Sequence, residues 1–269
     1  MERTLGLMCG AGGLPARMAA EARRQGWRIV AFAFDGVPVE LPQTERVVPS
    51  RITELGPVVA ELKNEAAAAI LLSGKFRHAA VVPGRPDATA THIAERAGSR
   101  VDRPLLEAVV AMLADLGIAV LDQRPFLGDW LAPEGSWSAR APSEAEWRDI
   151  RAGLAVARTI AGARIGQSVV VKQGAIVAVE AAEGTTEAIR RGTALAGPGT
   201  VVVKAVAVDH DYRFDTPTVG LETLGAAAAG GVAAIAVEAG RILIVDREAV
   251  TRRADAAGIA LVSVAAVGS

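Results

Sequence analysis

Near its start the chain reads Thr4-Leu-Gly-Leu-Met-Cys-Gly-Ala-Gly-Gly-Leu-Pro15, and this segment sets the architecture of the first half of the protein. The apolar residues up to Cys9 predict a short buried strand, and the glycines that follow predict a tight loop. Pro15 suits the first turn of a helix that ends near Gln25, and Arg28 to Phe34 predicts a second strand. The order strand, glycine loop, helix, strand is typical of a Rossmann-like, doubly wound α/β domain with a parallel sheet.

The glycine loop is a candidate phosphate-binding site, because backbone N–H groups at the start of a helix attract anions. Pro15 stands where the dinucleotide fingerprint Gly-x-Gly-x-x-Gly has its third glycine, whereas Asp35 lies about 20 residues further on, as a ribose-binding acid would. We therefore favour the phosphate of a nucleotide or sugar nucleotide over nicotinamide redox chemistry. A glycine turn that serves only tight packing is the alternative. The candidate contacts are Gly10, Gly12, Gly13 and Leu14.

A second unit of the same kind follows. Residues 55–65 predict a helix and residues 67–72 a strand, which runs into Ser73-Gly-Lys-Phe-Arg-His78. Ligands of open α/β sheets bind beyond the carboxyl ends of strands, so Lys75 and Arg77 are candidate phosphate contacts, with exposed loop residues as the alternative. A helix at 104–116 and a strand at 118–121 complete a first domain of residues 1–124.

Residues 125–142 change in character and predict a linker, since they hold prolines, glycines and no sustained period. Its Trp130 and Trp137 are expected to lie between the domains or under a lipid-like ligand. Ser143 and Glu146 form a capping-box pattern that opens a helix to about residue 163. Residues 143–269 then mix hairpin signals, such as Gln173-Gly174, with strand–helix units, which predicts a C-terminal mixed α/β domain.

The second domain holds an unusually charged segment, Lys204-Ala-Val-Ala-Val-Asp-His-Asp-Tyr-Arg-Phe-Asp215. It follows an apolar strand and precedes a predicted helix at 221–229, which is a common way to build a site on a rigid scaffold, although a solvated loop is the alternative. Asp215, Glu180 and Glu183 all follow apparent strands. Oxygen-only carboxylate ligands suit Mg²⁺, so these three acids are the candidate metal ligands.

Composition narrows the class of function. The chain is 51% hydrophobic and 4% aromatic, which predicts an aliphatic core, and its net charge of −1 argues against a nucleic-acid partner held by a basic surface. Cys9 is the only cysteine, which excludes a thiolate zinc site and predicts a buried, inert thiol. The longest uncharged stretch, residues 223–237, is shorter than the roughly 18 residues of a spanning helix, and no signal-peptide pattern is present, so we expect a cytoplasmic protein.

Five segments together match a known pattern. They are Leu5-Gly-Leu-Met-Cys-Gly-Ala-Gly-Gly-Leu-Pro15, Ile165-Gly-Gln-Ser-Val-Val-Val-Lys-Gln-Gly174, Val177-Ala-Val-Glu-Ala-Ala-Glu-Gly-Thr185, Arg213-Phe-Asp-Thr-Pro-Thr-Val-Gly220 and Glu238-Ala-Gly-Arg-Ile-Leu-Ile-Val-Asp-Arg-Glu-Ala-Val250. In this combination the chain resembles the two-domain UDP-2,3-diacylglucosamine pyrophosphatases of lipid A biosynthesis, the LpxI type.

The resemblance implies Mg²⁺-dependent hydrolysis of UDP-2,3-diacylglucosamine to UMP and 2,3-diacylglucosamine 1-phosphate (lipid X), in a site between the two domains. Asp215 falls on the critical aspartate of the family's Arg-x-Asp-Leu-Pro motif, where it would hold the metal or orient the attacking water. The acylated substrate implies a protein peripheral to the inner-membrane surface, and the sequence is compatible with a homo-oligomer. The implied substrate contacts are Gly10, Gly12, Gly13, Leu14, Lys75, Arg77, Lys172, Gln173, Thr185, Lys204 and Arg213.

The chain departs from the family pattern at Ala207, His210 and Thr186. Two alternatives therefore stay open beside the implied activity. One is a divergent relative that acts on or binds another nucleotide-linked sugar. The other is a non-catalytic protein that binds a lipid or a nucleotide.

Overall fold

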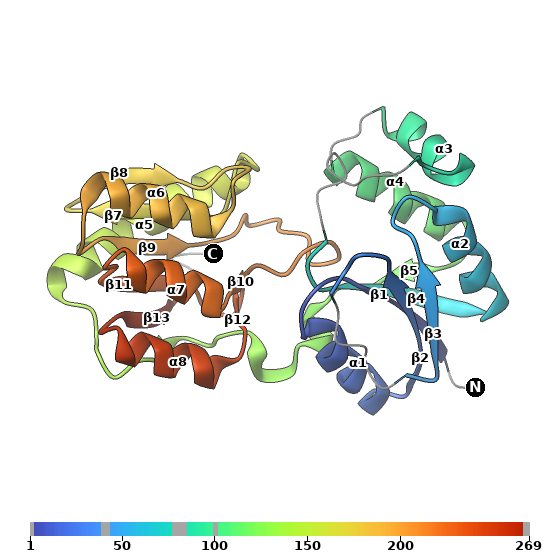
Figure 1. Ribbon diagram of the computed structural model, residues 1–269, viewed down its shortest axis with the longest axis horizontal. Coiled ribbons are helices and arrows are strands. Elements are labelled where there is room, and N and C mark those ends of the chain that lie inside the picture. Colours follow the sequence, from blue (N-terminus) through green and yellow to red (C-terminus); the bar gives the residue numbers. More distant parts are fainter. Residues whose placement is uncertain (1–2, 39–43, 77–84, 99–101, 266–269) are drawn as a thin grey trace. The chain divides into compact units, whose positions relative to one another are not determined.

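The structure is a computed structural model that describes residues 3–38, 44–76, 85–98 and 102–265. Its chain forms two compact units, which we describe separately (Figure 1). The N-terminal unit comprises Met1–Gly128 and also Asp211–Asp215, which come from the charged segment of the second half. The C-terminal unit comprises Asp129–His210 and Thr216–Ser269.

The N-terminal unit is built on a five-stranded parallel sheet, which confirms the predicted fold class. In spatial order the strands are β3 (Arg46–Ser50), β2 (Trp27–Phe34), β1 (Arg3–Cys9), β4 (Ala67–Ser73) and β5 (Ala119–Val120). β1 pairs with β2 on one side and with β4 on the other, so the strand order reverses there. The loops after β1 and β4 therefore meet at the carboxyl edge, where open α/β sheets bind ligands.

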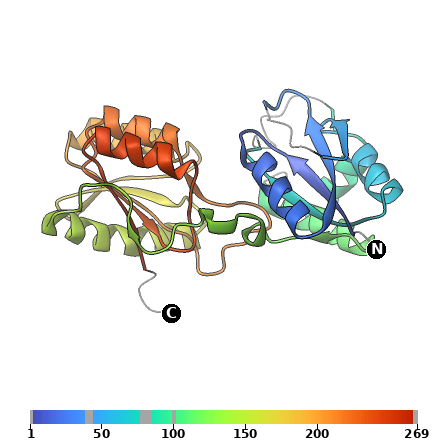
Figure 2. The same ribbon diagram turned by 90° about the horizontal axis from the view of Figure 1, so that it is seen from below.

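Four helices cover this sheet: α1 (Leu14–Arg24), α2 (Leu55–Asn64), α3 (Ala88–Ala97) and α4 (Asp102–Asp115). α1 lies on one face and α2 and α4 lie on the other, with α3 packed against both of them (Figures 1 and 2). Leu62 of α2 and Leu113 of α4 pack in one buried cluster with Phe32 and Ile70 of the sheet. This aliphatic packing holds the carboxyl edge of the sheet in a fixed geometry.

The C-terminal unit has a six-stranded mixed sheet, as predicted. In spatial order its strands are β6 (Gly135–Ser136), β13 (Ala260–Val264), β11 (Ala234–Glu238), β9 (Val201–Lys204), β7 (Ser168–Lys172) and β8 (Ala175–Val179). The three central strands β13, β11 and β9 are parallel, and β6, β7 and β8 pair antiparallel. A small second sheet joins β10 (Thr218–Val219) to β12 (Leu243–Ile244).

The hairpin between β7 and β8 turns at the predicted dipeptide. Gln173 has a φ of 50° and Gly174 a φ of 81°. Two successive positive φ values are the signature of a type I′ turn, whose twist matches that of the flanking strands.

Helices cover both faces of the mixed sheet (Figures 1 and 2). α5 (Glu144–Gly162) lies on one face, and α6 (Thr185–Ala196), α7 (Leu221–Ala229) and α8 (Arg247–Ala256) lie on the other. Val202 packs in the cluster with α6 and α7, whereas Ala236 packs in the cluster with α5. Because side chains alternate along a strand, Lys204 points to the α6–α7 side and Glu238 to the α5 side.

The structure differs from the sequence expectations in several elements. Residues 125–142 were assigned to a linker, but residues 125–128 belong to the N-terminal unit and residues 129–142 to the C-terminal unit, where β6 pairs with β13. Trp137 was expected between domains or under a ligand; it packs against the core of its own unit instead, and its Nε1 donates to Ser263 Oγ at 2.6 Å. None of the described helices is long and apolar enough to cross a membrane.

Candidate functional site

The glycine loop after β1 is held against the loop after β4. Ala11 N donates to Lys75 O at 2.9 Å, and Lys75 N donates to Ala11 O at 3.0 Å, so the two residues form an antiparallel bridge. Only glycine fits where the two loops cross, since a Cβ on Gly10 would lie 2.8 Å from the carbonyl carbon of Gly74. Gly10 therefore serves backbone packing.

Gly12 and Gly13, in the rest of the loop, are candidates for binding a ligand. A Cβ on Gly12 or Gly13 would meet no atom within 4 Å, so packing leaves space above this backbone. Gly12 N donates to Pro38 O at 3.3 Å, and α1 begins at Leu14 with no side-chain cap and no acid in its first turn. An uncapped helix start carries a partial positive charge that suits a phosphate. Lys75 is exposed beside it, whereas Arg77 lies outside the described residues.

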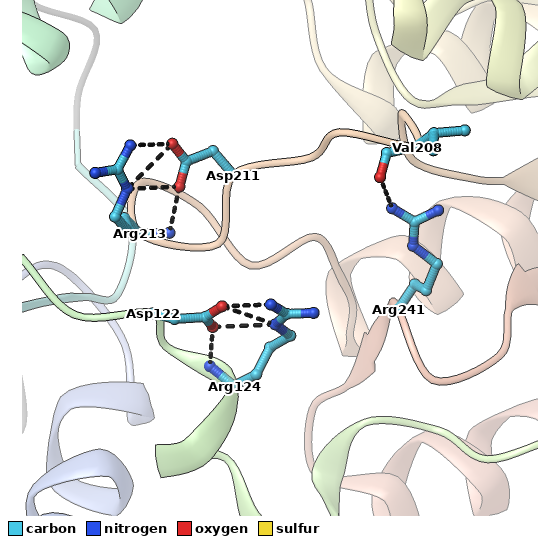
Figure 3. A network of polar contacts seen from close by, with 6 residues as sticks. All are labelled: Asp122, Arg124, Val208, Asp211, Arg213 and Arg241. Atoms are coloured by element: carbon cyan, nitrogen blue, oxygen red, sulfur yellow. Dashed lines mark hydrogen bonds and ion pairs between the residues drawn. The ribbon is translucent and has the colours of Figure 1, made fainter.

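Two Asp-x-Arg segments in the N-terminal unit have the same geometry (Figure 3). Arg124 Nε donates to the two carboxylate oxygens of Asp122 at 3.1 and 3.0 Å, and Arg213 Nε donates to those of Asp211 at 3.0 and 3.2 Å. In each pair the backbone N–H of the arginine also donates to the aspartate, at 2.8 and 3.1 Å respectively. Both guanidinium groups are thus oriented in advance by a carboxylate two residues earlier.

These pairs shift the pKa values of their members toward the charged forms. The hydrogen bond to Asp211 raises the pKa of Arg213 above its ordinary value. Burial raises the pKa of Asp122, but the hydrogen bonds from Arg124 outweigh it and leave the pKa below its ordinary value. Asp122, whose pKa is lowered, and Arg124 and Arg213, whose pKa values are raised, are therefore charged at neutral pH.

Tyr212 attaches the Asp211–Asp215 segment to the N-terminal unit. Its side chain is 3% exposed, its carbonyl accepts a hydrogen bond from Gln123 N at 3.1 Å, and the guanidinium carbon of Arg124 lies 4.4 Å from its ring centre. Asp215 ends the segment and is exposed. Asp122, Arg124 and Tyr212 were not among the predicted site residues, although the repeated Asp-x-Arg pattern could have drawn attention to them.

A polar cluster in the C-terminal unit surrounds Lys204, which is 4% exposed. Lys204 Nζ donates to Thr185 Oγ1 at 2.9 Å, lies 3.5 Å from Ser168 Oγ and lies 3.9 Å from Glu180 Oε2. Thr185 Oγ1 in turn donates to Glu180 Oε1 at 2.9 Å. Of the predicted residues, the structure brings Lys204, Thr185 and Glu180 together; Ser168 is an addition.

The strands and helices explain why these four residues meet. Ser168 starts β7 and pairs with Lys204 at the end of β9, and Glu180 N donates to Ser168 O at 2.9 Å just after β8. Thr185 is the first residue of α6, whose N-cap Gly184 makes no side-chain cap. The cluster therefore lies at the carboxyl edge of the parallel strands, where a rigid scaffold presents a buried ammonium group.

Other predicted residues have structural partners elsewhere. Lys172 Nζ donates to the carbonyls of Ala196 and Pro198, at 2.7 and 2.6 Å, at the end of α6. Gln173 forms the hairpin turn, and its N–H donates to Asp149 at 2.9 Å. Lys172 ends β7, the strand that Ser168 begins, so Lys172 and Gln173 lie at the edge of the sheet opposite to the Lys204 cluster.

Glu183 is exposed and pairs with Arg191 Nη2 at 2.6 Å, while Ala181 N donates to it at 3.1 Å. The hydrogen bond from Arg191 holds the pKa of Glu183 below its ordinary value. Glu180 and Glu183, which lie three residues apart in the sequence, thus have different basic partners.

A buried acid that the sequence reasoning did not select lies on the α5 side of the same sheet edge. Glu238 is 1% exposed and accepts hydrogen bonds from Arg158 Nε and Nη2 at 3.2 and 3.0 Å. Its other oxygen accepts from Val206 N at 3.0 Å, and Arg241 Nη1 lies 3.7 Å away. An acid at the end of an apolar strand was the signal in the sequence.

The described residues contain no group of three or more His, Cys, Asp or Glu side chains arranged to hold a metal ion. Glu180 and Glu183 each have a basic partner, Lys204 and Arg191, which makes them poor ligands for a divalent cation. Asp215 is an exposed carboxylate. A single carboxylate fits Mg²⁺ when the remaining ligands are water and phosphate oxygens of a substrate.

Comparisons with known proteins agree over nearly the whole chain. A family model described as the LpxI N-terminal domain matches residues 4–130, and one described as the LpxI C-terminal domain matches residues 133–262. UDP-2,3-diacylglucosamine pyrophosphatase LpxI of Caulobacter vibrioides is 31% identical over 280 residues, covering 97% of this chain and 98% of that protein.

Proposed function

The chain belongs to the LpxI family, and on that premise we propose that it hydrolyses the pyrophosphate bond of UDP-2,3-diacylglucosamine to UMP and 2,3-diacylglucosamine 1-phosphate. The observation that carries the proposal is the similarity over 97% of the chain to a protein of that name. Because the substrate carries two acyl chains, we further propose that the protein acts in the cytoplasm at the inner-membrane surface.

The reaction consumes one water molecule. The water oxygen forms a bond to one phosphorus, the P–O bond to the bridging oxygen breaks, and that oxygen leaves with the second phosphate. The proton lost by the attacking water passes to the solvent. Negative charge concentrates on the phosphate oxygens during this step, so cations and N–H donors that face them lower the barrier.

In the N-terminal unit we assign phosphate binding to the backbone at Gly12 and Gly13 and to Lys75. The absence of packing above the two glycines and the uncapped start of α1 support this assignment. We assign Arg213 to the phosphates as well, since Asp211 holds its guanidinium in one orientation. Planar guanidinium groups suit phosphate oxygens, which they bind in pairs.

In the C-terminal unit we assign substrate binding to Lys204, with Thr185 and Ser168 as the groups that orient its ammonium. Lys204 is 4% exposed and its ammonium lies 3.9 Å from the carboxylate of Glu180, and a buried charge is costly unless it is compensated. An anionic ligand would supply further compensation. Lys172, Gln173 and Glu183 have no role in this proposal, because their contacts are those of a helix end, a turn and a surface ion pair.

We propose that Asp215 is the catalytic aspartate and that it binds Mg²⁺ together with substrate phosphate oxygens. Such an ion would neutralise charge on the pyrophosphate and lower the pKa of a bound water. The exposed position of Asp215 supports this, since Mg²⁺ keeps several waters when it binds to proteins.

The test is a product analysis of UDP-2,3-diacylglucosamine in detergent micelles with Mg²⁺ and with EDTA. We expect UMP and the sugar 1-phosphate with Mg²⁺ only, and hydrolysis in ¹⁸O-water identifies the attacked phosphorus by mass. Asp215→Asn is expected to lower kcat by at least about 100-fold. The matched control is Asp209→Asn, since Asp209 is exposed and pairs with Arg164 at 3.6 Å. Absence of UMP from the wild type, or equal rates for wild type and Asp215→Asn, would refute the proposal.

The same assay separates the alternatives. Activity on non-acylated UDP-sugars at equal or higher kcat/KM would favour the divergent relative. Tight binding without any cleavage, in Mg²⁺ and in EDTA alike, would favour a binding protein.

A further inference from the structure

The chain leaves the C-terminal sheet at the end of β9 through a loop with little regular structure but extensive burial. Ala205, Val206 and Ala207 are 0%, 1% and 8% exposed, and Val208 is then 91% exposed. The loop directly follows Lys204, and it leads into the Asp211–Asp215 segment of the N-terminal unit. Both ends of this loop therefore carry residues to which we assign substrate contacts.

The backbone of the loop is held partly by backbone hydrogen bonds and partly by the side chains of Glu238 and Arg241. Ala205 N donates to Gln167 O at 2.9 Å, and the next N–H, that of Val206, donates to the carboxylate of Glu238 at 3.0 Å. Arg241 Nη2 then donates to the carbonyl of Ala207. It also donates to that of Val208 at 3.1 Å (Figure 3). Three consecutive residues thus depend on Glu238 and Arg241.

Glu238 is itself fixed from α5, and Arg241 lies beside Glu238. Arg158 donates two hydrogen bonds to Glu238, and Arg241 Nη1 lies 3.7 Å from the same carboxylate. A carboxylate that is 1% exposed is an expensive way to stabilise a fold, because a well-packed apolar side chain often does as well. Buried ionic groups of this kind are better suited to fixing one backbone geometry among several.

We infer that Arg241 and Glu238 are positioning residues for the hydrolysis proposed above. They fix the backbone at 206–208, and through it the end of β9 that carries Lys204 and the start of the connection to Asp215. Neither residue needs to touch the substrate in this role. The inference rests on the proposed function where enzyme kinetics are measured, but not where amide hydrogen exchange is measured.

The test combines kinetics with amide hydrogen exchange in Arg241→Ala and Arg241→Lys. We expect kcat to fall by about 10- to 100-fold with KM within about threefold, since small misplacements of reacting groups have effects of this size. Exchange is expected to rise in peptides covering residues 205–210 and to stay unchanged in β11 and β13. Lysine should restore activity only partly, because it lacks the planar fork that reaches two carbonyls and a carboxylate. Millimolar guanidinium should rescue the alanine variant.

Arg252→Ala is the matched control, since Arg252 is an exposed arginine paired with Glu248 at 3.5 Å. Wild-type kcat in Arg241→Ala overturns the inference. So does a fall in Tm with faster exchange throughout the sheet, which would show a merely structural role. If the wild type releases no UMP, the proposed function fails, and exchange confined to residues 205–210 still supports the holding role.

Discussion

The guanidinium carbon of Arg124 lies 4.4 Å from the ring centre of Tyr212. The same guanidinium binds the carboxylate of Asp122, two residues earlier in the chain. Through this contact, residues 122–124 hold the segment that carries Asp215. We predict that Tyr212→Ala costs about 3–5 kcal/mol of local stability, the usual range for deleting a buried aromatic ring. Hydrogen exchange of residues 211–215 is the measurement, and activity should fall with it. Tyr212→Phe keeps the ring and should retain most of both; equal effects of the two substitutions would contradict this account.

Asp211 and Asp122 offer a matched pair of substitutions, because each binds the arginine two residues later in the same geometry. Asp211→Asn is expected to raise KM and lower kcat/KM by about tenfold, since Arg213 loses a charge-assisted hydrogen bond of about 1.5–3 kcal/mol that orients it. Asp122→Asn should change stability more than kinetics. Steady-state assays of both variants check this, and a larger kinetic effect of Asp122→Asn would count against the role of Arg213.

The ionisation of Glu146 makes the stability of the fold depend on pH. Burial raises its pKa, but hydrogen bonds from Arg140 and from Ser143 N outweigh it and leave the pKa below the ordinary value of 4.5. A lowered folded-state pKa stabilises the fold above pH 4.5, and this contribution disappears as the pH falls through the folded-state value. Glu146→Gln should therefore lower Tm at pH 7 and converge with the wild type at strongly acidic pH. Glu144→Gln, an exposed acid in the same helical turn, should shift Tm little at any pH.

Cys9 should be unreactive in the native protein. Its side chain is fully buried, and burial raises its pKa to about 12, so almost no thiolate exists at pH 8. Ellman's reagent is expected to titrate one thiol in denaturant and none without it over minutes. Fast native labelling would show that β1 opens readily. The burial of this thiol was predicted from the apolar run around it and is confirmed.

The sequence predicted those elements that have a strong local signal. The glycine loop with Pro15, the Ser143–Glu146 capping box and the Gln173–Gly174 turn each appear where expected. Elements with a weak local signal had no expectation, and β3 and α3 are examples. β3 is a short edge strand that contains Pro49 and has only one buried residue, and α3 buries Ile93 alone, so neither shows a clear apolar period.

The candidate site was harder to predict, since sequence motifs do not reveal which end of a strand a residue occupies. Lys172 and Thr185 belong to neighbouring sequence motifs. The side chain of Lys172 binds the last residue of α6, whereas Thr185 is the first residue of that helix. The contacts of Glu238 with Arg158 and Val206 join residues 80 and 32 positions apart, a relationship that only the fold can establish. Conversely, the clustering of Lys204 with Glu180 follows from strand pairing and could be derived once the hairpin was assigned.

Lys204 and Lys172 provide the sharpest comparison within the C-terminal unit, because both are lysines at strand ends but with different partners. Lys204→Met removes an ammonium that donates to Thr185 and lies 3.9 Å from Glu180. A lost charge-assisted hydrogen bond of about 1.5–3 kcal/mol corresponds to a fall in kcat/KM of about 10- to 100-fold if the group also binds the substrate phosphates. Lys204→Arg keeps the charge and should recover part of the loss.

Lys172→Met removes the donor to Ala196 O and Pro198 O and should lower Tm while kcat/KM stays close to that of the wild type. Steady-state kinetics and thermal unfolding of the three variants make the comparison. The opposite pattern, with activity lost in Lys172→Met and retained in Lys204→Met, would place phosphate binding at the other edge of the sheet. A loss of activity in Lys204→Met that salt or higher substrate concentration does not relieve would assign Lys204 to the chemical step rather than to binding.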